Sequence, residues 1–463
     1  MKLRVAAVVA VFVAGSADAA SVRIGIGHQS MCTDTYSAGV IVKELKLIEK
    51  YLPKDGKYKR VKYSLDWKDY TSGPPITNMM LANKLDFGVM GDYPLIVNGA
   101  KFQETRKMRS LYIAGTGYNM RGSGNALVVP VGSDAYSFED LKNREVSVPE
   151  GSAAWGMTLK AMHDIGLSSD VIKLKNQSPP VGAANIANQK IAAHADFCPW
   201  PEIMEFQGTG RKIYDGSETG VPYLHGVVVR KDYADKYPEV VVAFMKAIIE
   251  AGNWVQEDPV GAAESLEKWT GVPKEVQYLY FGKGGTLTLD PTIKKPWIDA
   301  LTLQHGVLAR EKAIPPLNMD EWIDDRFIRQ AYAESGLDYE AQARQMVDPK
   351  SANKALPPAE IWHPGKGIES YASVADMLKA TADYEAAGQA INASYVYDEL
   401  TGLKLFGKVA FYVKTADGVF KTFMRKPDAV AYADRSGGSL LGIKEAVGSM
   451  KGAGLNAASA EGQ

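Results

Sequence analysis

The sequence predicts an α/β protein with two doubly wound lobes joined by a hinge, followed by a small C-terminal α+β domain. Short runs of β-branched residues alternate with helix-length segments between residues 22 and 335. Such alternation favours parallel sheets with helices on both faces. After a polar, proline-bearing stretch at 345–360, the order changes to a helix followed by several strands. That change indicates a separate domain of ordinary size.

The first lobe is organised around residues 81–100. An apolar strand at 86–90 breaks at Gly91-Asp92, and residues 93–95 open a helix. Ligands of open α/β sheets bind outside the carboxyl ends of the strands. Glycine lets the backbone approach a ligand closely, and the free N–H groups of a helix start attract anions. We therefore expect this turn to line a binding cleft.

Two further units, each a strand followed by a loop and a helix, precede this turn. Their loops are expected at the same edge of a parallel sheet. The expected elements are a strand at 22–27, a loop at 28–36, a helix at 39–51, a strand at 61–66, a loop at 67–75 and a helix at 76–84.

The chain then leaves the first lobe and returns to it. Extended segments at 108–117 and 125–130 cross outward, and a strand at 223–230 crosses back. Two crossings between two sheets form a hinge, so the cleft between the sheets can close. The second lobe is expected to contain strands at 145–149, 171–174 and 192–197, helices at 137–141, 151–162 and 181–188, and a loop at 198–202. Later helices are expected at 232–257, 262–269, 274–281, 293–305 and 319–335.

The first 20 residues have the pattern of a secretory signal peptide. Lys2 and Arg4 precede an apolar run at 5–14, and the small residues at 17–19 suit a cleavage site. We therefore expect a soluble protein exported to the bacterial periplasm. The predicted division is a signal peptide at 1–20, first-lobe segments at 21–125 and 226–344, a second lobe at 126–225, a linker at 345–360, a C-terminal domain at 361–450 and a disordered tail at 451–463.

Composition narrows the classes of function. A formal net charge of -1 and a hydrophobic content of 46% are typical of a globular protein without a nucleic-acid partner. The sequence contains no nucleophile elbow, Walker loop, His-Glu-x-x-His or EF-hand motif. These observations favour a binding protein over an enzyme.

Three stretches resemble ABC-transporter periplasmic substrate-binding proteins of the nitrate/sulfonate/taurine type, which are related in fold to thiamine-pyrimidine precursor binders. They are SFEDLKNREVSVPEGSAAWGMTLKAM at 137–162, LDFGVMGDYPLI at 85–96 and ADFCPWPEIMEF at 195–206. The resemblance covers residues 22–335 and implies a type II periplasmic binding fold. It also implies that a monomer captures a small sulfonate, oxyanion or related nitrogen/sulfur compound by closing the second lobe. The partner would be a membrane permease with a cytoplasmic ATPase.

The resemblance also indicates which loops line the cleft. The predicted ligand-binding residues are His28, Gln29, Cys32, Asp34, Tyr36, Trp67, Tyr70, Gly91, Asp92, Tyr93, Gly151, Ser152, Trp155, Asp196, Trp200 and Glu202. The aromatic residues could stack on a planar ligand or hold a cation. The carboxylates favour an amine-bearing ligand, or an oxyanion held by N–H groups and hydroxyls. Helix capping by Asp34 and Asp92 is the alternative.

The C-terminal domain is similar to the NosL family of copper chaperones that accompany nitrous oxide reductase. The similar stretches are YASVADMLKATADY at 371–384, VAFYVKTADGVFKTFM at 409–424 and DAVAYADRSGGSLLGIKEA at 428–446. The family's Cys-Gly-Met motif falls near 362–367, where this chain has no cysteine. His363 and Met424 remain as candidate copper ligands. A docking or structural domain that has lost its metal is the alternative.

Five histidines and cysteines fall on segments that the fold could bring to the cleft: His28, Cys32, His194, Cys198 and His225. Thiolate and imidazole together suit copper or zinc. A metal-handling periplasmic protein is therefore the rival interpretation. His194 lies inside an apolar strand and is expected to be a core histidine. For Cys32 and Cys198, a disulfide, two unlinked thiols and a shared metal site all remain open.

Overall fold

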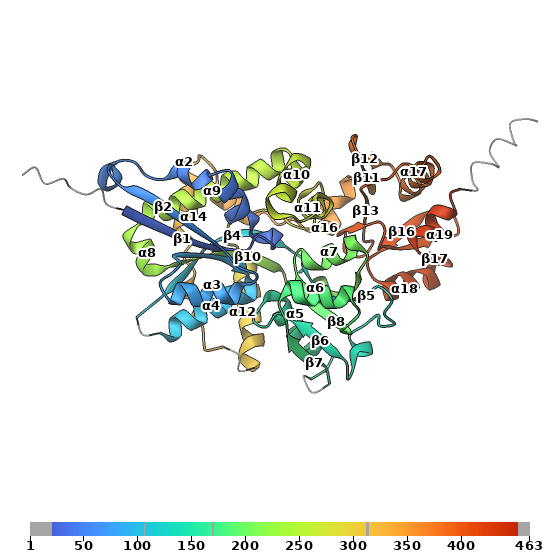
Figure 1. Cartoon of the computed structure of the whole chain (residues 1–463), viewed down its shortest axis with the longest axis horizontal. Helices are drawn as coiled ribbons and strands as arrows, with labels where there is room; N and C mark the ends of the chain where they lie inside the picture. Colours follow the sequence, from blue (N-terminus) through green and yellow to red (C-terminus); the bar gives the residue numbers. More distant parts are fainter. Residues whose placement is uncertain (1–20, 106, 169–170, 312–313, 452–463) are drawn as a thin grey trace, which may run out of the picture.

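The computed structural model describes residues 21–105, 107–168, 171–311 and 314–451. Figure 1 shows the first sheet at the left, the second sheet below the centre and the C-terminal sheets at the right. The predicted signal peptide at 1–20 and residues 452–463 of the predicted tail lie outside the described residues. Within the described ranges, no helix combines the length and the apolar character that crossing a membrane requires.

The first lobe is built on a mixed five-stranded sheet in the order β2-β1-β3-β10-β4. Its strands are β1 (Ser21–His28), β2 (Lys62–Asp69), β3 (Phe87–Gly91), β4 (Ser110–Asn119) and β10 (Tyr223–Arg230). β1 runs parallel to β2 and β3, whereas β10 runs antiparallel to β3 and β4. The sheet is therefore not purely parallel, because the returning strand β10 enters it in the opposite direction.

The second lobe repeats this arrangement in the order β7-β6-β8-β5-β9. Its strands are β5 (Asn125–Pro130), β6 (Glu145–Val148), β7 (Lys173–Asn176), β8 (Ala193–Phe197) and β9 (Gly210–Asp215). β6 is parallel to β7 and β8, and β5 is antiparallel to β8 and β9. The chain crosses between the lobes from β4 to β5 and again from β9 to β10. The predicted fold class, two α/β lobes with two crossings, is confirmed.

Helices cover both sheets. Those next to the first sheet are α1 (Val40–Glu44), α2 (Leu47–Tyr51), α3 (Gly73–Leu81), α4 (Asp92–Glu104), α8 (Lys231–Lys236) and α9 (Pro238–Glu257). The second lobe contains α5 (Ala153–Asp164), α6 (Pro179–Ala187) and α7 (Trp200–Gln207). The chain after α9 forms α10 (Pro259–Thr270), α11 (Lys274–Phe281), α12 (Lys295–Arg310), α13 (Met319–Trp322), α14 (Arg326–Glu334), α15 (Tyr339–Arg344) and α16 (Pro349–Ala352). Short 3₁₀ helices are η1 (Thr33–Ala38), η2 (Gly56–Tyr58), η3 (Glu139–Leu141), η4 (Gly216–Thr219) and η5 (Asn353–Ala355).

Several expected helices are divided in the structure. The helix predicted at 39–51 breaks at Lys46, whose φ of 53° is left-handed. The helix predicted at 232–257 begins again at Pro238, because proline cannot donate the hydrogen bond that a helix interior needs. The helix predicted at 319–335 is interrupted at Ile323, which is extended and forms a bridge to Tyr112.

The C-terminal segment contains two small sheets, β12-β11-β13-β14 and β16-β15-β17. Its elements are β11 (Ala359–His363), β12 (Gly367–Tyr371), α17 (Val374–Ala386), β13 (Ala393–Tyr397), β14 (Lys404–Phe406), β15 (Phe411–Lys414), β16 (Phe420–Phe423), α18 (Lys426–Ser436), β17 (Ser439–Leu441) and α19 (Ile443–Gly448). It packs against both α7 and α11. The ring of Phe406 lies 5.5 Å from that of Phe206, and Tyr278 donates a hydrogen bond to Glu360.

Candidate functional site

A small cavity lies where the two lobes meet. Its volume is ≈ 10 Å³, about the minimum that one water molecule requires. Residues of both lobes and of the crossing strand β10 enclose it: Gln29, Cys32, Gly73, Gly91, Pro94, Ser152, Ala153, Phe197, Tyr223 and His225. A solute larger than water therefore needs the lobes to move apart before it can enter.

Three helix N-termini converge on this cavity. Gly73 begins α3, Gly91 directly precedes α4, and Ser152 caps α5 by accepting a hydrogen bond from the backbone N–H of Trp155. The helix dipole favours negative charge at all three starts. The prolines Pro74 and Pro75 of α3 and Pro94 of α4 have no N–H, so these two helices offer few N–H donors. The first turn of α5 contains no proline, and its first N–H groups have no partner within the helix. The described lining of this cavity contains no lysine or arginine. The arrangement can therefore hold an anion through N–H groups and hydroxyls without a cationic side chain.

Gly91 allows the lobes to approach closely at this point. The register of the first sheet sets Gly91 opposite His225. A Cβ atom added at Gly91 would lie 3.1 Å from Nε2 of His225 and 3.4 Å from Cβ of Ala153 in the second lobe. The φ of Gly91 is -73°, so the backbone would accept another residue. The size of the side chain at this position is limited by the space between the lobes, not by the backbone conformation.

A second cavity of ≈ 20 Å³ adjoins the first and shares Tyr223 with it. Asp92 and Tyr93 line it from the first lobe. The carboxylate of Asp92 accepts hydrogen bonds from the backbone N–H of Tyr93 at 2.7 Å and from Nε2 of Gln304 at 2.5 Å. Burial nevertheless raises the pKa of Asp92 to about 7. The carboxyl group contributes little negative charge to the cleft below that pH.

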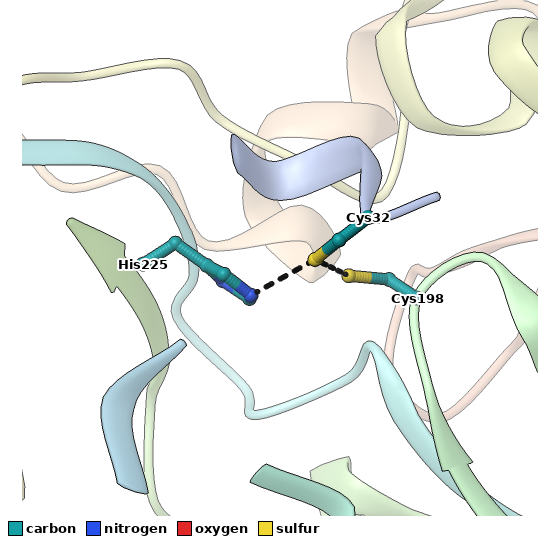
Figure 2. A group of neighbouring side chains, drawn as sticks. All are labelled: Cys32, Cys198 and His225. Carbon is teal, nitrogen blue, oxygen red and sulfur yellow. Dashed lines mark hydrogen bonds between the residues drawn. The ribbon is translucent and has the colours of Figure 1, made fainter. Parts of the chain in front are cut away.

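Cys32, Cys198 and His225 form a cluster beside the first cavity, and Figure 2 shows their side chains pointing toward one another. Sγ of Cys32 lies 3.4 Å from Sγ of Cys198 and 3.4 Å from Nε2 of His225. Both cysteines are free thiols in this structure. Burial raises the pKa of the Cys198 thiol and lowers that of His225 to about 3. The imidazole is therefore neutral at pH 7.

Asp34 lies beside the cluster rather than in the cavity lining. Its Oδ2 atom is 3.5 Å from Nδ1 of His225. Burial raises the pKa of Asp34 to about 7.

His28 and Trp67 do not lie in loops that face the cavity, contrary to the sequence interpretation. β1 extends through His28 and β2 extends through Asp69, so both residues are strand residues. Their rings pack edge to face at 5.6 Å, and Trp67 also packs against Phe244 of α9. Burial lowers the pKa of His28 to about 4. Both side chains contribute to packing beneath α9.

Asp196 and Glu202 are occupied by partners within the protein. Oδ2 of Asp196 lies 2.8 Å from Nε2 of His194, whose Nδ1 lies 2.7 Å from Oγ of Ser147. This group is fully buried in the second lobe, which agrees with a core role for His194. Glu202 pairs with Lys212.

The remaining predicted residues also lie outside the lining of the two cavities. Tyr36 is buried and donates a hydrogen bond to the carbonyl of Ser30. Trp200 lies in α7 and not in a loop, because the expected loop at 198–202 becomes a helix after Pro199. Tyr70, Gly151 and Trp155 are partly exposed. Of the sixteen predicted residues, the first cavity brings together Gln29, Cys32, Gly91 and Ser152, and the second includes Asp92 and Tyr93.

Gly73, Ala153 and Phe197 lie within segments predicted to line the cleft but were not singled out, whereas Pro94 and Tyr223 were missed as lining residues. A signal existed for Tyr223. It stands two residues before His225 on one strand, and residues two apart share a face of a sheet.

The two candidate copper ligands lie at the ends of strands that belong to different sheets. His363 ends β11, where its Nδ1 atom lies 2.8 Å from the carbonyl oxygen of Pro364. Met424 directly follows β16. A copper site there remains a prediction.

Two mixed sheets of matching topology, crossed twice by the chain and enclosing a cavity, define the fold of type II periplasmic binding proteins. The chain belongs to the NMT1-like family, which matches residues 15–269 of the 463.

The chain is similar in sequence to named relatives and in fold to a solved structure. The taurine-binding periplasmic protein of Escherichia coli is 29% identical over 191 residues, which span 41% of this chain and 56% of that relative. A putative aliphatic sulfonates-binding protein of Bacillus subtilis is 24% identical, with 68% of this chain and 88% of the relative covered. The alkanesulfonate-binding protein of Xanthomonas axonopodis pv. citri, solved with bound MOPS, superposes with a TM-score of 0.55 at 21% identity. That match covers 66% of this chain and 98% of that one.

Proposed function

We propose that this protein is the periplasmic solute-binding component of an ABC importer, and that it captures a small sulfonate or related oxyanion between its lobes. The convergence of α3, α4 and α5 at the interlobe cavity carries this proposal. The relatives named for taurine and aliphatic sulfonates support the same class of ligand.

The electrostatics of the cleft favour an anion over an amine. The amine-bearing ligand considered from the sequence required ionised carboxylates in the cleft. Asp34 and Asp92 are both buried with pKa values raised to about 7, and Glu202 is neutralised by Lys212. A sulfonate has three oxygens that N–H groups at helix starts can bind.

The mechanism is opening and closing of the two lobes. A cavity of ≈ 10 Å³ cannot contain a sulfonate, so the lobes separate at the β4–β5 and β9–β10 crossings, admit the solute and close over it. A ligand shifts this equilibrium only through contacts that differ between the open and closed states. Gly91 on the first lobe and Ser152 on the second supply such contacts from opposite sides.

Delivery follows from closure. The closed, loaded protein docks as a monomer on a membrane permease driven by a cytoplasmic ATPase, and the leader predicted at 1–20 directs it to the periplasm. We infer that the C-terminal NosL-like domain serves docking or structure. Its packing on α7 and α11 and the missing motif cysteine support this inference over copper binding.

A thermal-shift measurement with a panel of solutes tests this function. Taurine, methanesulfonate, sulfate and nitrate are compared with ethanolamine, which keeps the amine of taurine but lacks the sulfonate. A true ligand at 100 times its Kd stabilises the protein by about 2.7 kcal/mol, which raises Tm by about 3 °C for a chain of this length. We expect this rise with at least one sulfonate or oxyanion and none with ethanolamine. A response to ethanolamine alone would overturn the assignment.

A further inference from the structure

Three soft or borderline donor atoms converge at the interlobe contact from segments far apart in the chain. Cys32 follows β1, Cys198 follows β8, and His225 lies on β10. Their donor atoms all lie within 4.8 Å of one another, and all three side chains are buried. In Figure 2 each side chain comes from a different element and ends at a common point.

The surroundings of His225 are those of a metal ligand. Nε2 faces the two sulfurs, and Nδ1 has no hydrogen-bond partner among the described residues although it is buried. Oδ2 of Asp34 lies 3.5 Å from that nitrogen. Histidines that bind metals through one nitrogen usually donate the other N–H to a carboxylate. A small movement of either side chain would complete this arrangement.

We propose that Cys32, Cys198 and His225 bind a thiophilic d¹⁰ cation, Zn²⁺ or Cu⁺. This inference goes beyond the proposed transport function and does not depend on it. Thiolate and imidazole are preferred ligands of both ions. Charge balance favours Zn²⁺, because two thiolates neutralise it and a buried site then holds no net charge. Binding Zn²⁺ to the two thiols and the neutral imidazole releases two protons.

Two of the three donor separations fit such a site closely. Tetrahedral coordination with Zn–S near 2.3 Å and Zn–N near 2.0 Å places two sulfurs about 3.8 Å apart and a sulfur and a nitrogen about 3.5 Å apart. The observed separations from Sγ of Cys32 are both 3.4 Å, within a few tenths of an ångström of these values. The third separation, between Sγ of Cys198 and Nε2 of His225, is within 4.8 Å, and a bound ion would draw this pair together. The hydroxyl of Tyr223, 3.1 Å from Nε2 of His225, stands at the same point. It can occupy or border a fourth position.

The site joins the two lobes. Cys198 comes from the second lobe, whereas Cys32 and His225 belong to the first. A bound cation is therefore complete only when the lobes are closed. Cys32 and His225 also line the first cavity, so the cation would face the solute-binding position.

Metal titration of the reduced protein tests the proposal. The mature protein is treated with a reductant and a chelator, then titrated with Zn²⁺ against a chromophoric chelator, with Cu⁺ under anaerobic conditions in a parallel arm. Co²⁺ replaces Zn²⁺ for spectroscopy, because thiolate ligands give Co²⁺ intense tetrahedral bands. We expect one ion per chain and thiolate-to-cobalt charge transfer. No stoichiometric uptake of either ion would overturn the proposal.

Variants assign the ligands. Cys32→Ser, Cys198→Ser and His225→Gln are each expected to weaken binding at least 100-fold, and Asp34→Asn 10–100-fold. His163→Gln changes an exposed histidine and should bind as the wild type does. If a ligand variant does not fold, the reactivity of the thiols in the wild-type protein is measured instead. Bound Zn²⁺ should slow the labelling of both cysteines by a thiol reagent. Labelling that Zn²⁺ does not slow would contradict the site. So would stoichiometric binding by a folded Cys32→Ser, Cys198→Ser double variant, or a failure of the protein to bind metal once any disulfide between the two cysteines has been reduced.

Discussion

Gly91→Leu is expected to weaken solute binding at least 100-fold, which corresponds to about 2.7 kcal/mol of binding free energy. The leucine side chain would extend toward His225 and Ala153, whose nearest atoms lie 3.1 and 3.4 Å from a Cβ at this position. It would fill the ≈ 10 Å³ cavity and hold the lobes apart. Isothermal titration with the solute identified in the thermal-shift panel measures the loss.

Gly132→Leu provides the matched control, since no atom lies within 4 Å of a Cβ at Gly132. It should bind as the wild type does. Gly91→Ala adds only the Cβ atom and should give an intermediate loss. Circular dichroism and urea unfolding establish that each variant is folded. A folded Gly91→Leu protein with wild-type affinity would show that the solute does not bind between these surfaces.

Lys212→Met is expected to lower the free energy of unfolding by about 3–5 kcal/mol at pH 8, because it leaves buried carboxylates without their cation. Lys212 pairs with Glu202 and lies 3.7 Å from Glu205 and 3.9 Å from Asp215. Glu202 also accepts a hydrogen bond from Tyr280 of α11. The network therefore connects the second lobe to the part of the chain that follows α9.

The same variant has a defined pH dependence. Burial raises the pKa of Glu205 from its ordinary 4.5 to about 7, so the folded state binds more protons than the unfolded state between those values. The stability that this group contributes is full below pH 4.5 and is lost as the pH rises through 7. Without Lys212 the carboxylates ionise less readily still, so the destabilisation should be smaller at pH 5 than at pH 8.

Urea unfolding at both pH values measures this difference. Lys295→Met removes an exposed lysine that pairs with Asp299 and should change stability by no more than about 0.5 kcal/mol. Two results would contradict the compensating role of the lysine. One is a loss of unfolding free energy in Lys212→Met that is as small as the control's, and the other is a loss that is larger at pH 5 than at pH 8.

The sequence was most informative about elements with their own local signals. The strands Asn125–Pro130 and Tyr223–Arg230 and the helix Lys274–Phe281 have the predicted bounds. The two strands consist largely of β-branched and apolar residues between turn residues, and the helix starts after a proline. The strand β9, GRKIYD, was missed because polar residues dominate it. Its pairing with β5, which is remote in sequence, determines its conformation.

The site was predictable only in part, because its details depend on spatial distances between residues that are far apart in the sequence. The Gly91 turn and the Ser152 helix start could be recognised from residue types. The extension of β1 to His28 and of β2 to Asp69 follows from their mutual pairing, which no local pattern specifies. The approach of Cys32 to Cys198 depends on how the two lobes close, and residue spacing contains no measure of that.

The most direct test of the anion-binding cleft is a calorimetric comparison of ethanesulfonate with ethanesulfonamide, which is similar in size and shape but uncharged. In the proposed cleft, the dipoles of three helix starts would favour the negative charge, and N–H groups such as those of α5 would bind the sulfonate oxygens. We expect one ethanesulfonate to bind per chain, at least tenfold more tightly than the sulfonamide, with the preference retained at high salt because the site is buried. Equal affinities for the two compounds, or binding of neither while another class of solute binds, would contradict this account of the cleft.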